Sequence, residues 1–148
     1  TVKPVHDPPK RFLIVVTPNA RVATASAYAA LNAASLTTSE SNSILSSSLA
    51  EQISADSTQW RLRNDFETVI FEIEPEIERV KIALLEAGAR GALLAGSGSS
   101  VFGVFGDEAT RDRALENLRC EAGWKIFPCH TLSRDEYVRP IIPLFTLS

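Results

Sequence analysis

The sequence has no methionine, only two cysteines and no long hydrophobic run among its 148 residues. Its longest unbroken apolar stretch, residues 12–16, is far shorter than the roughly 20 residues that a membrane-spanning helix needs. We therefore expect no membrane partner. Because a chain without Met that opens at Thr1 is unusual for a complete gene product, we expect a fragment or a processed chain.

The two cysteines, Cys120 and Cys129, fit no zinc-binding spacing, and one pair does not make a disulfide framework. We predict two free thiols in a reducing, cytoplasmic environment. The N-terminus has no hydrophobic core of a signal peptide. His6 and His130 are far apart in sequence and have no neighbouring cluster of carboxylates, so we predict no metal site.

Basic residues are outnumbered: 15 Lys and Arg stand against 18 Asp and Glu, for a net charge of −3. This balance argues against a duplex nucleic-acid partner, which needs a basic face. The length suits one domain, and 45% hydrophobic with 22% charged residues is ordinary for a globular protein. We predict an extended, proline-containing lead-in at residues 1–10 and one domain at residues 11–148.

The first half of the domain begins with an apolar strand at residues 12–16, which we expect to be buried on both faces. An Ala-rich helix should follow at residues 24–34, with Thr24 as its N-cap. The Ser-rich residues 35–57 read as a mobile loop followed by a weak helix. A disordered low-complexity linker is the alternative for this segment.

The next block predicts two helices. One starts at Asn64 and ends before Pro75, which suits the first turn of the second. Gly88 ends the second helix as its left-handed C-cap residue. One apolar stripe at helical spacing marks its buried face: Ile77, Val80, Leu84 and Ala87.

The remaining segments alternate strands and helices. Strands at residues 92–95 and 101–105 flank a glycine-containing loop, and a helix runs from Asp107 to Gly123. A last strand covers residues 125–132, and residues 141–147 form a possible edge strand or tail. This order predicts an α+β fold, with one antiparallel sheet and helices packed on one face.

The strongest chemical signal is the loop at residues 96–100. Two glycines let the backbone approach a ligand closely, and successive N–H groups in such a turn can bind an anion. Three hydroxyl groups add donors. A tight turn between two strands is the structural alternative. The loop is followed by neither the Lys of a phosphate-binding P-loop nor the third glycine of a dinucleotide-binding motif, because Val101 stands there.

A second polar group comprises Asn64, Asp65 and Glu67 around Phe66. Asn64 or Asp65 is favoured as a helix cap, and the alternative places these side chains near a substrate. We interpret Trp60 and Trp124 as packing residues. Three arginines could contact phosphate, although a solvated surface is the usual explanation: Arg61, Arg63 and Arg134.

Residues 92–105 resemble the third conserved motif of the GHMP kinases. Residues 15–18 with 22–28, and residues 64–67 with 75–88, are similar to the branch of that superfamily that acts on diphosphocytidyl-methylerythritol. The resemblance covers about residues 12–135. It implies a ferredoxin-like C-terminal domain, with an antiparallel sheet and helices on one face.

The resemblance further implies a two-domain enzyme that uses ATP and Mg²⁺ to phosphorylate the 2-hydroxyl of a diphosphocytidyl substrate in non-mevalonate isoprenoid synthesis. In that family the nucleotide loop and the catalytic Lys and Asp lie in the N-terminal half, which no stretch of this sequence matches. We expect no catalytic residue here, a chain inactive alone, and a missing N-terminal kinase half as its partner. The carried-over substrate-binding residues are Gly96, Ser97, Gly98, Ser99, Ser100 and Thr24.

The same element order also suits a stand-alone regulatory or interaction module on a ferredoxin-like sheet. Such a module would bind a small effector or a partner chain.

Overall fold

The computed structural model describes residues 7, 9–31 and 63–139. Within them the predicted order of elements is confirmed. The predictions for residues 35–57 and 141–147 fall outside the described residues, and the domain boundary at residue 10 stays a prediction. The elements are β1 (Phe12–Thr17), α1 (Thr24–Ala30), α3 (Phe66–Ile73), α4 (Pro75–Glu86), β2 (Gly91–Leu94), β3 (Val101–Phe105), α5 (Glu108–Asn117), β4 (Lys125–His130) and α6 (Arg134–Val138).

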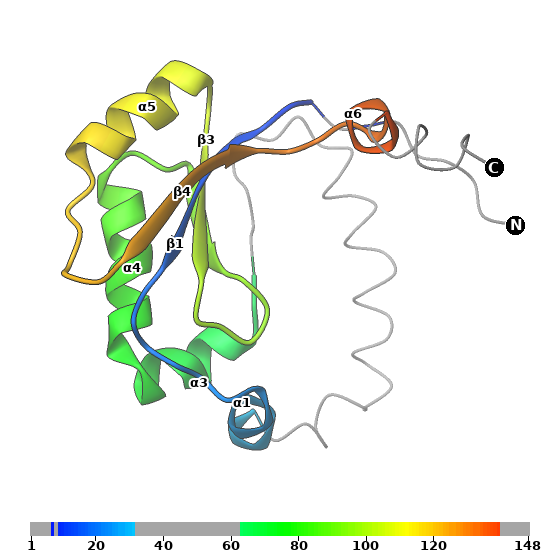
Figure 1. The fold of residues 1–148 in the computed structure, drawn as a ribbon. Coiled ribbons are helices and arrows are strands. Elements are labelled where there is room, and N and C mark those ends of the chain that lie inside the picture. The colour runs from blue at the N-terminus through cyan, green and yellow to red at the C-terminus, as the bar shows by residue number, and fades with distance from the viewer. Residues whose placement is uncertain (1–6, 8, 32–62, 140–148) are drawn as a thin grey trace, which may run out of the picture.

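The four strands form one antiparallel sheet in the order β2-β3-β1-β4. Helices α4 and α5 pack on the same face of it, α4 against β2 and β3, and α5 against β1 and β3 (Figure 1). Strands β1 and β2, joined through α4, and strands β3 and β4, joined through α5, each form a split βαβ unit, because another strand lies between the two in the sheet. Two such units are the plan of ferredoxin-like domains. The predicted α+β class, with helices on one face, is therefore confirmed.

Strand β1 alternates in burial. Ile14 and Val16 are fully buried, whereas Leu13 and Val15 are only half-buried. Successive side chains of a strand point to opposite faces, and α4 and α5 cover one of them. The prediction that this strand is buried on both faces is therefore wrong.

Helix α4 supplies the main helical contribution to the core. Ile77, Val80 and Leu84 are fully buried, as their spacing predicts. Pro75 occupies the first turn, where its missing N–H costs no hydrogen bond. Gly88 follows the helix at φ +98°, a left-handed conformation that glycine adopts without steric cost. Both predicted ends of this helix are confirmed.

Two helix boundaries differ from the prediction. Thr24 is the first residue of α1 and not its cap, because Ala23 holds the extended N-cap position. Helix α5 begins at the predicted cap Asp107, whose side chain accepts a hydrogen bond from Thr110 N–H, but it ends at Asn117. Leu118 turns to an extended backbone there and keeps its side chain buried, while Gly123 lies in a later turn.

Helix α6 was not predicted, although its start carries a readable signal. Ser133 and Glu136 form a capping box, in which each side chain bonds the other residue's backbone N–H. The preceding strand therefore ends at His130, two residues earlier than expected.

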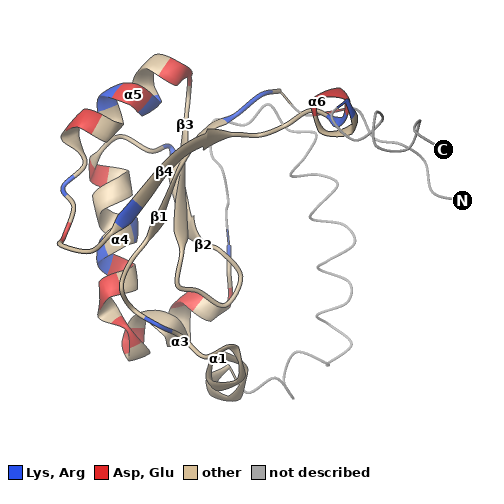
Figure 2. Ribbon diagram, in the orientation of Figure 1, with Lys and Arg blue, Asp and Glu red and all other residues tan. Residues whose placement is uncertain are grey.

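Charged side chains gather along α4 and α5, whereas β2 and β3 carry none (Figure 2). Among the described residues, no helix is both long enough and apolar enough to cross a membrane. The turn between β2 and β3 also carries no charged residue, so the two strands and their turn are uncharged.

Candidate functional site

The glycine loop, residues 95–100, is a tight turn that joins β2 to β3. Ala95 N–H donates to the Ser100 carbonyl at 2.8 Å, and Gly98 N–H donates to the Ala95 carbonyl at 3.1 Å. Gly96 and Gly98 have φ of +59° and +98°, a region that side chains disfavour. The turn interpretation is therefore confirmed, and it explains why both positions are glycine.

Hydroxyl groups tie this loop to two other elements. Ser97 Oγ donates to Thr24 Oγ1 at 3.3 Å, at the first residue of α1. The Ser100 and Thr17 hydroxyls share a 2.8 Å hydrogen bond at the end of β1. Thr24 and the loop, predicted separately as ligand-contacting residues, thus lie side by side.

Some donors of the loop remain available. Within the described part of the chain, the Ser99 hydroxyl has no hydrogen-bond partner, and neither do the N–H groups of Ser97 and Ser99. Neighbouring N–H groups that converge in a turn can bind an anion. The loop therefore has three donors that a ligand could use without breaking a hydrogen bond that shapes the loop.

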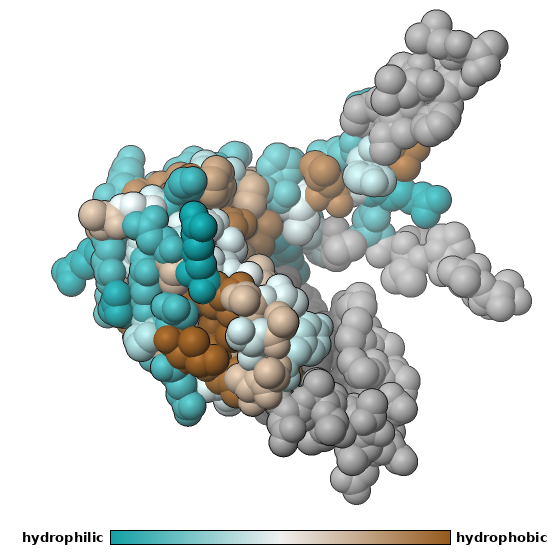
Figure 3. Space-filling model, turned by 60° about the horizontal axis from the view of Figure 1, so that its bottom comes forward, coloured by the Kyte–Doolittle hydropathy of each residue, from teal (hydrophilic) through white to brown (hydrophobic). Residues whose placement is uncertain are grey.

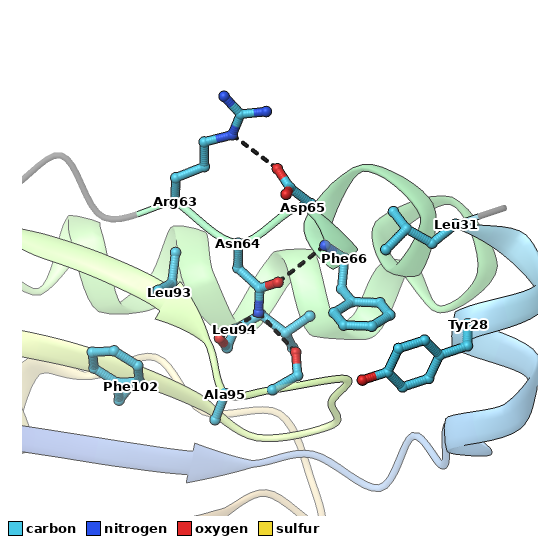
Figure 4. Close-up of a pocket in the computed structure, with 11 residues that line it drawn as sticks. Tyr28, Leu31, Arg63, Asn64, Asp65, Phe66, Leu93, Leu94, Ala95 and Phe102 are labelled. Carbon is cyan, nitrogen blue, oxygen red and sulfur yellow. Dashed lines mark hydrogen bonds and ion pairs between the residues drawn. The ribbon is translucent and has the colours of Figure 1, made fainter. Parts of the chain in front are cut away.

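Asn64 contacts both the start of α3 and the glycine loop. Its Oδ1 accepts a hydrogen bond at 3.0 Å from the N–H of Phe66, the first residue of α3, whereas Asp65 holds the N-cap position and makes no cap hydrogen bond with its side chain. Its Nδ2 donates to the carbonyls of Leu94 at 2.9 Å and Gly96 at 2.7 Å (Figure 4). The second role brings this side chain to the loop, although sequence reasoning did not include Asn64 among the site residues.

Glu67 completes the contacts to the end of β2. Its Oε1 accepts a hydrogen bond from Leu94 N–H at 3.0 Å, and its Oε2 pairs with Lys81 Nζ at 2.6 Å. Both charged side chains are largely buried, with 15% and 24% of their surface exposed. Charge-assisted hydrogen bonds of this kind are stronger than neutral ones, so Glu67 holds Leu94 firmly.

A pocket of about 450 Å³ opens beside the loop, with Gly96 in its wall. Tyr28 and Phe66 meet edge to face there, with ring centroids 4.9 Å apart, and Tyr28 remains 48% exposed (Figure 4). Arg63 and Asp65 form an exposed ion pair at 2.9 Å on the rim. Figure 3 brings this end of the molecule forward and shows hydrophobic surface bordered by hydrophilic residues. The pocket can therefore receive a flat, partly apolar group.

The other predicted candidates that the structure describes lie elsewhere, whereas the predictions for His6, Trp60 and Arg61 fall outside the described residues. Trp124 packs at the core, and its Nε1 donates to Glu76 at 3.0 Å, which confirms a packing role. His130 is exposed beside Phe12 at the far end of the sheet. The part of the chain that the structure describes contains no group of three His, Cys, Asp or Glu that could hold a metal ion.

Both cysteines are free thiols, as predicted. Burial raises the pKa of the Cys120 thiol and of the Cys129 thiol. A raised pKa keeps a thiol protonated and therefore less nucleophilic.

Comparison with known sequences gives a consistent result. The profile of the family described as GHMP kinases C terminal matches residues 43–123, more than half of the chain. A 4-diphosphocytidyl-2-C-methyl-D-erythritol kinase of Solidesulfovibrio magneticus is 46% identical over 107 residues, covering 71% of this chain and 36% of that protein. The kinase of the same name from Solibacter usitatus is 37% identical over 139 residues, covering 90% and 42%.

Solved structures share the fold. A crystal structure of 4-(cytidine 5'-diphospho)-2C-methyl-D-erythritol kinase aligns with a TM-score of 0.61 and 26% identity, over 86% of this chain and 45% of that one. Mevalonate kinase of L. major, in complex with R-mevalonate, aligns with a TM-score of 0.66 and 19% identity, over 89% and 45%. The chain thus spans less than half the length of these relatives.

Proposed function

The chain belongs to the C-terminal family of the GHMP kinases, and we propose that it forms the substrate-side half of an ATP-dependent small-molecule kinase. The observation that carries this proposal is the tethered glycine loop with available donors beside an open aromatic pocket. Phosphoryl transfer depends mainly on positioning and on neutralising charge, which such a loop can provide for a substrate phosphate. We also propose that residues 11–148 form this domain.

The relatives' names support 4-diphosphocytidyl-2-C-methyl-D-erythritol as the substrate, phosphorylated on its 2-hydroxyl. Its diphosphate would accept hydrogen bonds from Ser97 N–H and from the N–H and hydroxyl of Ser99. Thr24 would orient Ser97 through their shared hydrogen bond. The cytosine ring would lie in the pocket against Tyr28, because an exposed aromatic ring can stack on a base. Gly96, Gly98 and Ser100 shape the loop.

The residues described here do not suit ATP or Mg²⁺. The glycine loop has no following Lys and leads into β3, so it lacks the helix that directly follows the loop of a phosphate-binding P-loop. No acidic cluster among the described residues could hold the ion. Bound Mg–ATP would supply the transferred phosphoryl group and neutralise its charge. We therefore propose that an N-terminal half holds both, that this chain contributes no catalytic residue, and that it is inactive alone.

The test uses amide chemical shifts of the purified chain during titration with cytidine diphosphate, with cytidine as the matched control. We expect cytidine diphosphate to shift residues 96–100 and Tyr28, and cytidine to shift Tyr28 alone. Ser99→Ala should weaken cytidine diphosphate binding about 10- to 150-fold through loss of one hydrogen bond to a charged group.

Two results would overturn the proposal. Turnover of ATP on the authentic substrate by the chain alone would contradict the assignment of catalysis to another half. Binding that leaves residues 96–100 unshifted, with a neutral effector perturbing a helix face, would favour a stand-alone regulatory module.

A further inference from the structure

Leu94 ends β2, one of the two edge strands of the sheet. It pairs with Val101, while the neighbouring Ala95 exchanges a backbone hydrogen bond with Ser100. In an antiparallel pair such bonds alternate along the strand, so the N–H and carbonyl of Leu94 point away from β3. They would have no partner in the sheet, because β2 is an edge strand.

Two side chains of one short segment supply those partners. Glu67 accepts from the Leu94 N–H, and Asn64 donates to the Leu94 carbonyl. The two residues lie three apart: Asn64 precedes α3, and Glu67 lies in its first turn. The start of this helix therefore takes the place of a further strand at the end of β2.

The second Asn64 donor extends this contact into the loop. It reaches the Gly96 carbonyl at 2.7 Å, the shortest of the three Asn64 hydrogen bonds. Gly96 has no side chain and sits at φ +59°, so nothing of its own holds it there. The serine hydroxyl bonds to Thr17 and Thr24 attach the loop's other side through flexible side chains, whereas Asn64 binds its backbone.

We propose that Asn64 is a positioning residue, which fixes the glycine loop in the conformation that presents its N–H donors to a substrate phosphate. This inference rests on the proposed function for the ligand, but the effect on the loop stands apart from it. Asn64 acts through Gly96 and need not touch the substrate.

Asn64→Asp separates the two roles of this side chain. The carboxylate can still accept from Phe66 N–H at the start of α3, but it has no donor and would face two carbonyl oxygens. We expect amide shifts at residues 96–98, and about tenfold weaker cytidine diphosphate binding, since two hydrogen bonds that fix the loop are lost.

Asn117→Asp is the matched control. Asn117 Nδ2 donates to the Arg113 carbonyl at 2.8 Å in α5, so this variant loses the same kind of bond and gains the same charge far from the loop. It should leave the amides of residues 96–98 and the affinity for cytidine diphosphate unchanged.

A measurement on the unaltered chain covers the case in which Asn64→Asp fails to fold. The two Asn64 side-chain amide protons should exchange slowly with solvent, because both are hydrogen-bonded. Free exchange at Asn64, or unchanged loop shifts in a folded Asn64→Asp variant, would refute the positioning role.

The outcomes for the two proposals can be told apart. If the unaltered chain does not bind cytidine diphosphate, the proposed substrate fails, while altered loop shifts in Asn64→Asp still support the positioning of the loop. If both forms bind equally and the loop shifts are unchanged, the positioning role fails and the proposed substrate stands.

Discussion

The two ends of the sheet are held in different ways. At the glycine-loop end, hydrogen bonds join residues 27 to 83 positions apart, from Glu67–Leu94 to Thr17–Ser100. At the opposite end, the start of α5 is held by a hydrogen bond between residues three positions apart, and the start of α6 by one such bond together with a bond from Arg134 N–H to Asp7. A helix can satisfy its first N–H groups with its own side chains. A turn built on glycine has few side chains of its own, so distant residues must hold it.

Glu67→Ala should destabilise the glycine-loop end the most. It leaves the Leu94 N–H without its acceptor and Lys81 without its partner in a largely buried place. We expect a loss of about 2–4 kcal/mol in the free energy of unfolding, measured by urea denaturation. Glu67→Gln keeps an acceptor for the Leu94 N–H, so its free energy of unfolding should fall by less. Equal stability of Glu67→Ala and the unaltered chain would mean that the loop end does not depend on this contact.

Gly98→Ala and Gly88→Ala form a matched pair with a smaller effect. Both glycines have φ +98°, one in the loop and one after α4 at the other end of the sheet. An added Cβ meets no neighbour within 4 Å at Gly88 and only ordinary contacts at Gly98, the nearest at 3.5 Å. Each substitution should therefore cost about 1–2 kcal/mol from backbone conformation alone.

Ligand binding should distinguish the two glycine variants. Titration with cytidine diphosphate should show weaker binding for Gly98→Ala and unchanged binding for Gly88→Ala. Equal affinities of both variants for cytidine diphosphate would contradict a role of the loop end in binding.

Asp107→Ala should have the smallest effect, confined to the opposite end. The hydrogen bond from the Thr110 side chain is the main cause that lowers the pKa of the Asp107 carboxyl. A pKa lowered by folding stabilises the protein above the group's ordinary pKa, and this stabilisation disappears as the pH falls through the lowered value. We expect Asp107→Ala to lower Tm by about 2–4 °C near pH 7, and the difference to vanish in strong acid. The amides of residues 96–100 should not shift.

Local signals in the sequence predicted much of the fold. Pro75, Gly88 and Asp107 each mark a helix end through bonds or dihedral angles within a few residues, and the structure confirms all three. The predicted end of α5 was wrong because Leu118 leaves the helix and packs its side chain into the core. That contact is tertiary, so no local pattern in the sequence signals it. The capping box at Ser133 was readable, but the five residues of α6 are too few to show an apolar stripe.

The candidate site was only half predictable. Gly96 and Gly98, one residue apart, favour a turn with positive φ, because glycine adopts that region without steric cost. The carbonyls that Asn64 contacts lie 30 and 32 residues away, and no local pattern specifies that distance. The interpretation of Asn64 as a helix cap bears on one of its three side-chain hydrogen bonds, the bond from Phe66 N–H, because that one alone of the three is local.

The outer edges of the sheet carry a further consequence. An edge strand with free N–H and carbonyl groups is a template on which another chain can add a strand and begin to aggregate. At one edge, Glu67 and Asn64 occupy the outward groups of Leu94. At the other, Pro128 of β4 lies opposite Ile14 at a position whose N–H would point outward, and proline has none. The contacts that shape the loop thus also discourage this sheet from growing by recruiting further strands.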